Sequence, residues 1–166
     1  LRRLRNHGQD PAAPFERFVD AAPNYRLTEI GGALGVGQMA RLPAILEGRR
    51  RLGRLYLERL ADFDWLRVPA GVATPGNNFQ SFVVDVGTPA RRDALMARLR
   101  ADGIECTIGT YAVPAQPVYR TRYGVDPAEF PHAVAAMNRL LTLPLHPGMT
   151  VTDIARVAES LAGFPT

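Results

Sequence analysis

The sequence predicts an α/β sandwich, in which a small sheet carries helices on a face, preceded by a helical arm. Two observations predict it: the hydrophobic period changes after residue 61, and strand-like and helix-like segments alternate from there on. The 166 residues suffice for one compact domain with a sizeable core and an attached arm. Hydrophobic residues (46%) and charged residues (22%) occur in the proportions of a globular protein rather than a disordered one.

The arm covers residues 27–61, where apolar residues recur mostly at helical spacing. Pro43 lies inside this pattern and cannot donate a backbone hydrogen bond, so we expect either two helices or one helix kinked there. Residues 1–26 instead contain many helix and strand breakers, which predicts loops or short helices. These breakers are Asn6, Gly8, Pro11, Pro14 and Pro23.

Beyond the arm, segments rich in aromatic and β-branched residues alternate with segments of helical period. The expected strands are residues 65–68, 79–86, 104–110 and 142–145. The expected helices are residues 88–103, 131–141 and 152–161. The first of these helices has the clearest ends, because Thr88 suits an N-cap, Pro89 a first turn and Gly103 a C-terminal stop.

The charge pattern argues against a nucleic-acid partner. All 20 basic residues are arginine and the net charge is +4, but the arginines are scattered and interleaved with acidic residues. The densest cluster, Arg49 to Arg51 with Arg54, lies within the helical pattern. Because no stretch approaches 18 consecutive apolar residues and no signal-peptide run follows the first residues, we expect a soluble cytoplasmic protein.

Taken alone, the residue types indicate no catalytic constellation. His7, His132 and His146 lack partners at metal-ligand spacing, so no metal site is expected. Cys106 lies in an apolar strand pattern, as a small buried hydrophobe does. Residues 111–123 form an expected loop whose tyrosines and arginines suit an anionic, ring-bearing ligand, although an ordinary surface loop explains them equally well.

Several short motifs, in order along nearly the whole chain, resemble the DegT/DnrJ/EryC1/StrS aminotransferase family. The first is Asn24-Tyr25-Arg26-Leu27-Thr28-Glu29-Ile30, preceded by Leu4-Arg5-Asn6-His7-Gly8 and followed by Ala33-Leu34-Gly35. The later ones are Gln80-Ser81-Phe82-Val83-Val84, Ile108-Gly109-Thr110-Tyr111, Gln116-Pro117-Val118-Tyr119 and Leu143-Pro144-Leu145-His146-Pro147-Gly148-Met149. Each motif is weak alone, but their order and spacing together are specific.

The resemblance implies a homodimeric fold-type I enzyme that uses pyridoxal phosphate (PLP). Such an enzyme moves an amino group from glutamate or glutamine to a nucleotide-linked keto sugar, and a lysine carries the covalent link to the cofactor. The sequence contains no lysine, so the resemblance implies a carboxy-terminal part whose lysine lies upstream, inactive in isolation. Residues 1–26 would be a remnant of the large PLP domain, residues 27–61 the interdomain arm, and residues 62–166 the small domain with a mostly antiparallel sheet.

The resemblance also assigns site residues, none of them catalytic in this chain. Asn24 would bind the cofactor phosphate of the neighbouring subunit, and Arg26 would face the dimer interface or the substrate phosphates. Tyr111, Tyr119 and His146 would line the cleft for the nucleotide sugar. A cap for Asn24, an ion pair for Arg26 and a turn position for His146 are the structural alternatives.

Two other functions stay open. The first is a lysine-free PLP relative that dehydrates or otherwise modifies keto sugars. The second is a binding or regulatory module that retains the small domain without catalysis. The arm bears on this choice, since apolar residues over much of its circumference need a partner surface. A monomeric, non-aggregating arm in solution would favour the module.

Overall fold

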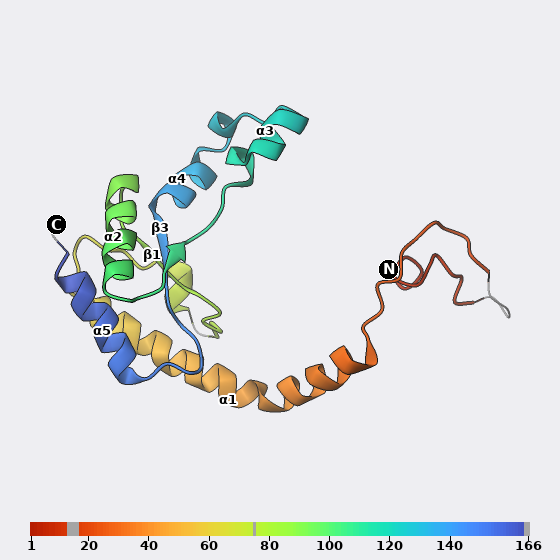
Figure 1. Cartoon of the computed structure of the whole chain (residues 1–166), viewed down its shortest axis with the longest axis horizontal. Coiled ribbons are helices and arrows are strands. Elements are labelled where there is room, and N and C mark those ends of the chain that lie inside the picture. Colours follow the sequence, from red (N-terminus) through yellow and green to blue (C-terminus); the bar gives the residue numbers. More distant parts are fainter. Residues whose placement is uncertain (13–16, 75, 165–166) are drawn as a thin grey trace. The chain divides into compact units, whose positions relative to one another are not determined.

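The computed structural model describes residues 1–12, 17–74 and 76–164, which divide into two compact units, Leu1–Pro43 and Ala44–Thr166. Helix α1 (Glu29–Leu60) begins in the first unit and ends in the second. The later strands are β1 (Phe82–Asp85), β2 (Thr107–Ile108) and β3 (Leu140–Leu143). The later α-helices are α2 (Pro89–Ala101), α3 (Pro117–Tyr123), α4 (Pro131–Arg139) and α5 (Val151–Ala162) (Figure 1). Short 3-10 helices cover Ala70–Ala73, Val113–Ala115 and Pro127–Glu129.

The start of the first unit consists of turns joined by isolated backbone bridges, as its breakers predict. Asn6 bridges Asn24, and Gln9 bridges Phe18. Gly8 has a φ of +72°, and a Cβ atom on it would overlap the backbone carbonyl of Asp20. Only glycine fits there. Within residues 1–12 and 17–28 there is no regular helix, and Pro14 lies outside the described residues.

Helix α1 continues through Pro43, so the alternative of two separate helices is wrong. One missing backbone donor in a helix of 32 residues removes a single hydrogen bond. The predicted kink at Pro43 stays a prediction. In the second unit the helix buries one face, with Leu52, Tyr56 and Leu60 at most 2% exposed.

The sheet is antiparallel and has the strand order β1-β3-β2. Phe82 is opposite Leu143, and Thr107 is opposite Thr142. The sheet therefore joins segments that are far apart in sequence through its central strand. The small antiparallel sheet with helices confirms the predicted α/β class.

The strands are shorter than expected, for local reasons. Residues 65–68 contribute only a bridge from Arg67 to Asp85. The expected strand 79–86 begins only at Phe82, because Phe79 has a φ of +46° and its N–H donates to the Asn77 side chain (2.7 Å). The expected strand 142–145 runs instead from Leu140 to Leu143, since Pro144 cannot donate a ladder hydrogen bond. The expected strand 104–110 is reduced to Thr107–Ile108.

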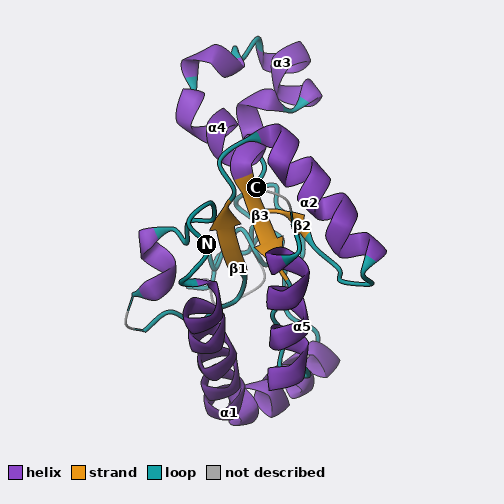
Figure 2. Ribbon diagram, turned by 90° about the vertical axis from the view of Figure 1, so that its left-hand side faces the viewer, coloured by secondary structure: helices purple, strands orange, loops and turns teal. Residues whose placement is uncertain are grey.

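Helices α2 and α5 lie beside the sheet and next to each other (Figure 2). Helix α2 has the predicted Thr88 cap, and both helices end within two residues of the positions that the sequence predicts. The Thr88 hydroxyl accepts from Arg91 N (3.2 Å), and Thr150 forms a capping box with Asp153. Helix α4 ends at Arg139, two residues earlier than expected, because the chain becomes extended at Leu140 to form β3.

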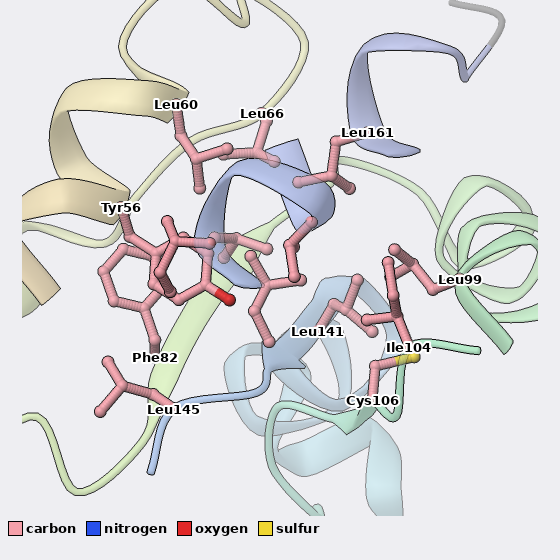
Figure 3. Packing of buried hydrophobic residues seen from close by; sticks show 14 of the residues in the cluster. Tyr56, Leu60, Leu66, Phe82, Leu99, Ile104, Cys106, Leu141, Leu145 and Leu161 are labelled. Carbon is pink, nitrogen blue, oxygen red and sulfur yellow. The ribbon is translucent and has the colours of Figure 1, made fainter. Parts of the chain in front are cut away.

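The hydrophobic core lies between the second half of α1, the sheet and helices α2 and α5 (Figure 3). The Tyr56 and Phe82 rings lie 4.7 Å apart, and the Tyr56 hydroxyl donates to the Pro144 carbonyl (2.9 Å). Burial, with a smaller contribution from the charge of Asp153, raises the pKa of the Tyr56 phenol. Tyr56 is therefore a neutral core residue that ties α1 to the end of β3.

The prediction of a loop over residues 111–123 is wrong in part, because α3 forms within it. Pro114, Pro117 and Gly124 are turn formers, but proline also suits the first helical turn and glycine the position after the last one. Here Pro117 begins the helix, and Gly124 ends it with a left-handed φ of +64°. The breakers therefore mark the ends of a helix.

Candidate functional site

The backbone around Asn24 is held in an extended path by the segment that contains Asn6. His7 N donates to the Pro23 carbonyl (3.1 Å), and Tyr25 N donates to the Arg5 carbonyl (2.8 Å). These two hydrogen bonds enclose the Asn6–Asn24 bridge. The position of Asn24 is thus fixed by contacts within the first unit.

The side chains of this unit form a cluster that presents hydrogen-bond donors. Asn24 Oδ1 accepts from the Arg26 backbone N (3.2 Å), which uses the acceptor end of the amide. The Arg26 guanidinium donates to Asn6 Oδ1, and Asn6 Nδ2 donates to Gln9 Oε1 (2.6 Å). Among the described residues the Nδ2 of Asn24 has no partner. An exposed amide N–H beside a guanidinium is suited to an anion such as a phosphate.

The structural alternatives for Asn24 and Arg26 were a cap and an ion pair, and the structure agrees with them only in part. Asn24 does close a local turn through its side-chain oxygen, although it caps no helix. Arg26 makes no ion pair within the described residues, because its partner is the amide of Asn6. Sequence reasoning gave Asn6 no role. Its place in the motif Leu4-Arg5-Asn6-His7-Gly8 was the available signal.

In the second unit, His146 follows the end of β3. It lines a groove, which we call the His146 groove. The groove consists of two adjoining hollows of about 390 and 230 Å3 that share Glu105, Pro144 and His146. Met149 N donates to the His146 carbonyl (3.0 Å), so His146 also occupies a turn. The exposed ring at the junction of two hollows is available to a ligand.

Charged groups of both signs border the larger hollow. Asp153 and Arg156 line it together with Glu105 and His146. Hydrogen bonds from the backbone and then the hydroxyl of Thr150 lower the pKa of Asp153, with the charges of His146 and Arg156 contributing less. Asp153 therefore stays ionised. This end of the groove can contact a polar ligand.

Tyr111 and Tyr119 lie away from His146. Because Ile108 is opposite Leu141 in an antiparallel pair, the chain beyond β2 leaves the sheet at the Leu140 end of β3. His146 follows the other end of that strand, after Leu143. The three residues predicted to line one cleft thus occupy opposite ends of the sheet within this unit.

Tyr111 and Tyr119 belong instead to an exposed aromatic and cationic surface around α3. Tyr111 is 70% exposed, and the Tyr119 and Tyr123 rings lie 5.9 Å apart. The Arg122 guanidinium lies 5.6 Å from the Tyr123 ring centre. Sequence reasoning noticed Arg122 and Tyr123 in this segment but assigned them no role, and their helical spacing to Tyr119 was the missed signal.

Cys106 matches the expectation from sequence. Cys106 is 5% exposed, and burial raises the pKa of its thiol, so it is a core residue. Within the described residues no group of three or more His, Cys, Asp or Glu side chains could hold a metal ion. No helix in the described part of the chain is long and apolar enough to cross a membrane.

The second unit is an α/β domain with the His146 groove, and the first unit carries an exposed cluster of hydrogen-bond donors around Asn24. Residues 1–162 match the family model described as the DegT/DnrJ/EryC1/StrS aminotransferase family. The chain belongs to this family. The resemblance seen in the ordered motifs is thereby confirmed.

Solved structures of aminotransferases share the fold. A DegT DnrJ EryC1 StrS aminotransferase from Brucella abortus is 28% identical (TM-score 0.79), over 98% of this chain and 42% of that one. DesV of S. venezuelae, solved in complex with a ketimine intermediate, is 26% identical (TM-score 0.81), over 96% of this chain and 42% of DesV. Spr1654 from Streptococcus pneumoniae in its PLP form is 22% identical (TM-score 0.84), over 96% of this chain and 41% of Spr1654. The chain thus spans about two fifths of the length of these proteins.

Proposed function

We propose that this chain supplies the small α/β domain and the arm of a PLP-dependent, homodimeric, cytoplasmic aminotransferase. The enzyme would transfer an amino group from glutamate or glutamine to a nucleotide-linked keto sugar. The family match over residues 1–162 carries the proposal. In it, residues 1–26 are a remnant of the large cofactor domain, residues 27–61 form the arm, and residues 62–166 form the small domain.

The donor cluster of the first unit fits the phosphate of PLP. Asn24 offers an amide N–H whose orientation is set by the bond from Arg26 N to Oδ1. Arg26 adds a positive charge held by Asn6. Asn24 would bind the cofactor phosphate of the neighbouring subunit, and Arg26 would face the substrate phosphates or the dimer interface. When bound, PLP supplies the electron sink for amino-group transfer.

The other proposed contacts concern the substrate. Tyr111 and Tyr119 present exposed rings, and Arg122 lies against the ring of Tyr123, the aromatic neighbour of Tyr119, a combination that suits a nucleotide. His146 offers an imidazole at the junction of the two hollows, of which the larger is also lined by Asp153 and Arg156, and this suits a hydroxylated ligand. Because these residues lie at opposite ends of the small sheet, we assign them to different parts of the substrate or to different subunits' sites.

The isolated chain is expected to be inactive, since covalent attachment of PLP needs a lysine amine and these 166 residues contain none. The purified chain mixed with PLP should show no covalent adduct by absorbance. It should also release no amino sugar from a nucleotide-linked keto sugar and glutamate. An adduct or a product would contradict this expectation.

A chimera tests the proposed activity. Residues 1–162 would replace the matching segment of the Brucella abortus aminotransferase, which is 28% identical. We expect turnover of a nucleotide-linked keto sugar with glutamate or glutamine, and no turnover of the same sugar without its nucleotide. A chimera that folds and binds PLP but transfers no amino group to any such sugar would overturn the proposal.

The same chimera tests Asn24. A hydrogen bond to a charged group contributes about 1.5–3 kcal/mol, so Asn24→Ala should weaken PLP binding about 10- to 150-fold. Tyr25→Phe is the matched control, because Tyr25 is the exposed neighbour and loses only a hydroxyl. Equal PLP affinity in the Asn24→Ala and Tyr25→Phe chimeras would remove Asn24 from the cofactor site.

A further inference from the structure

Arg49 lies on the second half of α1, and one nitrogen of its guanidinium donates hydrogen bonds to three backbone carbonyls. Its Nη1 donates to the carbonyls of Phe79 (2.8 Å), Gln80 (3.0 Å) and Leu145 (3.4 Å). Phe79 and Gln80 lead into β1, whereas Leu145 follows β3. One guanidinium therefore connects two segments that are more than sixty residues apart in sequence.

These two segments form walls of the His146 groove. The smaller hollow, of about 230 Å3, is lined by Gln80 and Ser81 on one segment and by Leu145 and His146 on the other. Arg49 holds the carbonyls of two of these four residues. Arg49 therefore ties the two walls of the smaller hollow together, beside the β1–β3 pairing that also joins them.

The wall next to Arg49 is also strained. Phe79 is buried (5% exposed) and has a φ of +46°, a left-handed conformation that is rare for a bulky residue. Asn77 Oδ1 accepts from Phe79 N (2.7 Å), and Arg50 Nε donates to the Asn77 carbonyl (3.2 Å). Such conformations persist only where several contacts enforce them, and they concentrate at ligand sites.

We propose that Arg49 is a positioning residue that sets the geometry of the His146 groove for its ligand. The inference rests on the proposed contact of His146 with the hydroxylated part of the substrate. Arg49 itself does not line the groove. Its hydrogen bonds to the carbonyls of Gln80 and Leu145 hold in place the backbone next to Ser81 and His146.

The test compares Arg49→Gln, Arg49→Lys and Arg54→Lys in the whole 166-residue chain. Lysine keeps a cationic donor and glutamine does not, while Arg54 is an exposed residue of the same helix. NMR of the ligand-free chains should show shifted signals for Gln80, Ser81 and the His146 ring in Arg49→Gln. The shifts should be smaller in Arg49→Lys and absent in Arg54→Lys, with the signals of α2, which does not line the groove, unchanged.

Three results would overturn the proposal. The groove signals of Arg49→Gln could coincide with those of the parent chain. The changes could extend equally into α2. Both Arg49 variants could lose the folded core, which would make Arg49 a structural support only.

Titration with UDP-glucose as a probe separates this inference from the proposed function. In the parent chain the probe should shift the His146 signals, and Arg49→Gln should weaken that binding about tenfold, as expected when preorganisation is lost. A parent chain in which UDP-glucose leaves His146 unaffected would contradict the substrate role of His146. The ligand-free comparison would still decide the role of Arg49.

Discussion

At the scale of single residues, two glycines of α1 in the second unit should respond oppositely to the same substitution. A Cβ atom on Gly53 would overlap the Phe79 ring, with Cε1 at 2.6 Å, whereas a Cβ on Gly48 would meet nothing within 4 Å. Gly53→Ala should destabilise the chain by about 1–3 kcal/mol. Gly48→Ala should stabilise it by about 0.5–1 kcal/mol. Urea denaturation measures both changes, and a shift of the same sign in the two variants would contradict this packing.

Asp85 is the residue of β1 that bridges to Arg67, and its ionisation should make the stability of the fold depend on pH. Burial alone would raise its pKa, but hydrogen bonds from Gly87 N (2.9 Å) and Arg67 Nη2 (2.8 Å), with the charge of Arg139, hold it below the ordinary value of 3.8. A carboxyl with a lowered folded-state pKa stabilises the fold above its unfolded-state pKa. That stabilisation is lost as the pH falls through the folded-state value.

Asp85→Asn should therefore lower the free energy of unfolding by about 1–3 kcal/mol at pH 7. The difference from the parent chain should shrink as the pH falls below about 4. Asp93→Asn is the control, because its carboxylate is 65% exposed and, among the described residues, pairs only with the adjacent Arg92. Denaturation at several pH values checks both variants, and a difference that is constant with pH would refute the assigned pKa.

At the scale of elements, the capping box at the start of α5 gives a separate prediction. The Thr150 hydroxyl accepts from Asp153 N (3.3 Å), and the Asp153 carboxylate accepts from Thr150 N (2.7 Å). Thr150→Ala should cost about 1 kcal/mol in urea denaturation. Thr152→Ala, an exposed change in the same helical turn, should cost nothing or stabilise slightly. Equal losses in both variants would mean that the cap contributes little.

Elements with local end signals were predictable from sequence, and elements that depend on distant partners were not. Helix α2 begins at Pro89 after its Thr88 cap, as the sequence indicates. Three of the four predicted strands were placed within two to three residues, with ends that depend in part on Pro144 and on the left-handed Phe79, whereas residues 65–68 form only a bridge. Helix α3 was missed because its two end residues were interpreted as turn formers.

The residues of the candidate site also differ in whether the sequence could identify them. Asn24 and Arg26 are close in sequence, so a motif could identify them together, and the structure places them in one cluster with Asn6. Arg49 belongs to the dense arginine cluster of the helical pattern, to which the sequence assigned no contact. Its contacts are with carbonyls 30, 31 and 96 residues away, which no local pattern encodes.

At the scale of the whole molecule, the second unit should fold without the first. All buried members of the hydrophobic core cluster, from Leu52 to Leu161, lie within Ala44–Thr166. Trp65 reports on this core, since its ring lies 5.8 Å from Phe63 and 5.9 Å from Phe164. A chain of residues 44–166 should therefore unfold cooperatively in urea when followed by Trp65 fluorescence.

Removing residues 1–43 should change the free energy of unfolding by no more than about 1 kcal/mol, which is small beside the roughly 5–15 kcal/mol of a typical domain. Leu99→Ala in the shortened chain is the sensitivity control, because Leu99 is fully buried and its truncation should cost about 2–5 kcal/mol. A shortened chain without a cooperative transition would show that the core needs the first unit. In that case the donor cluster around Asn24 and the His146 groove would belong to one folding unit.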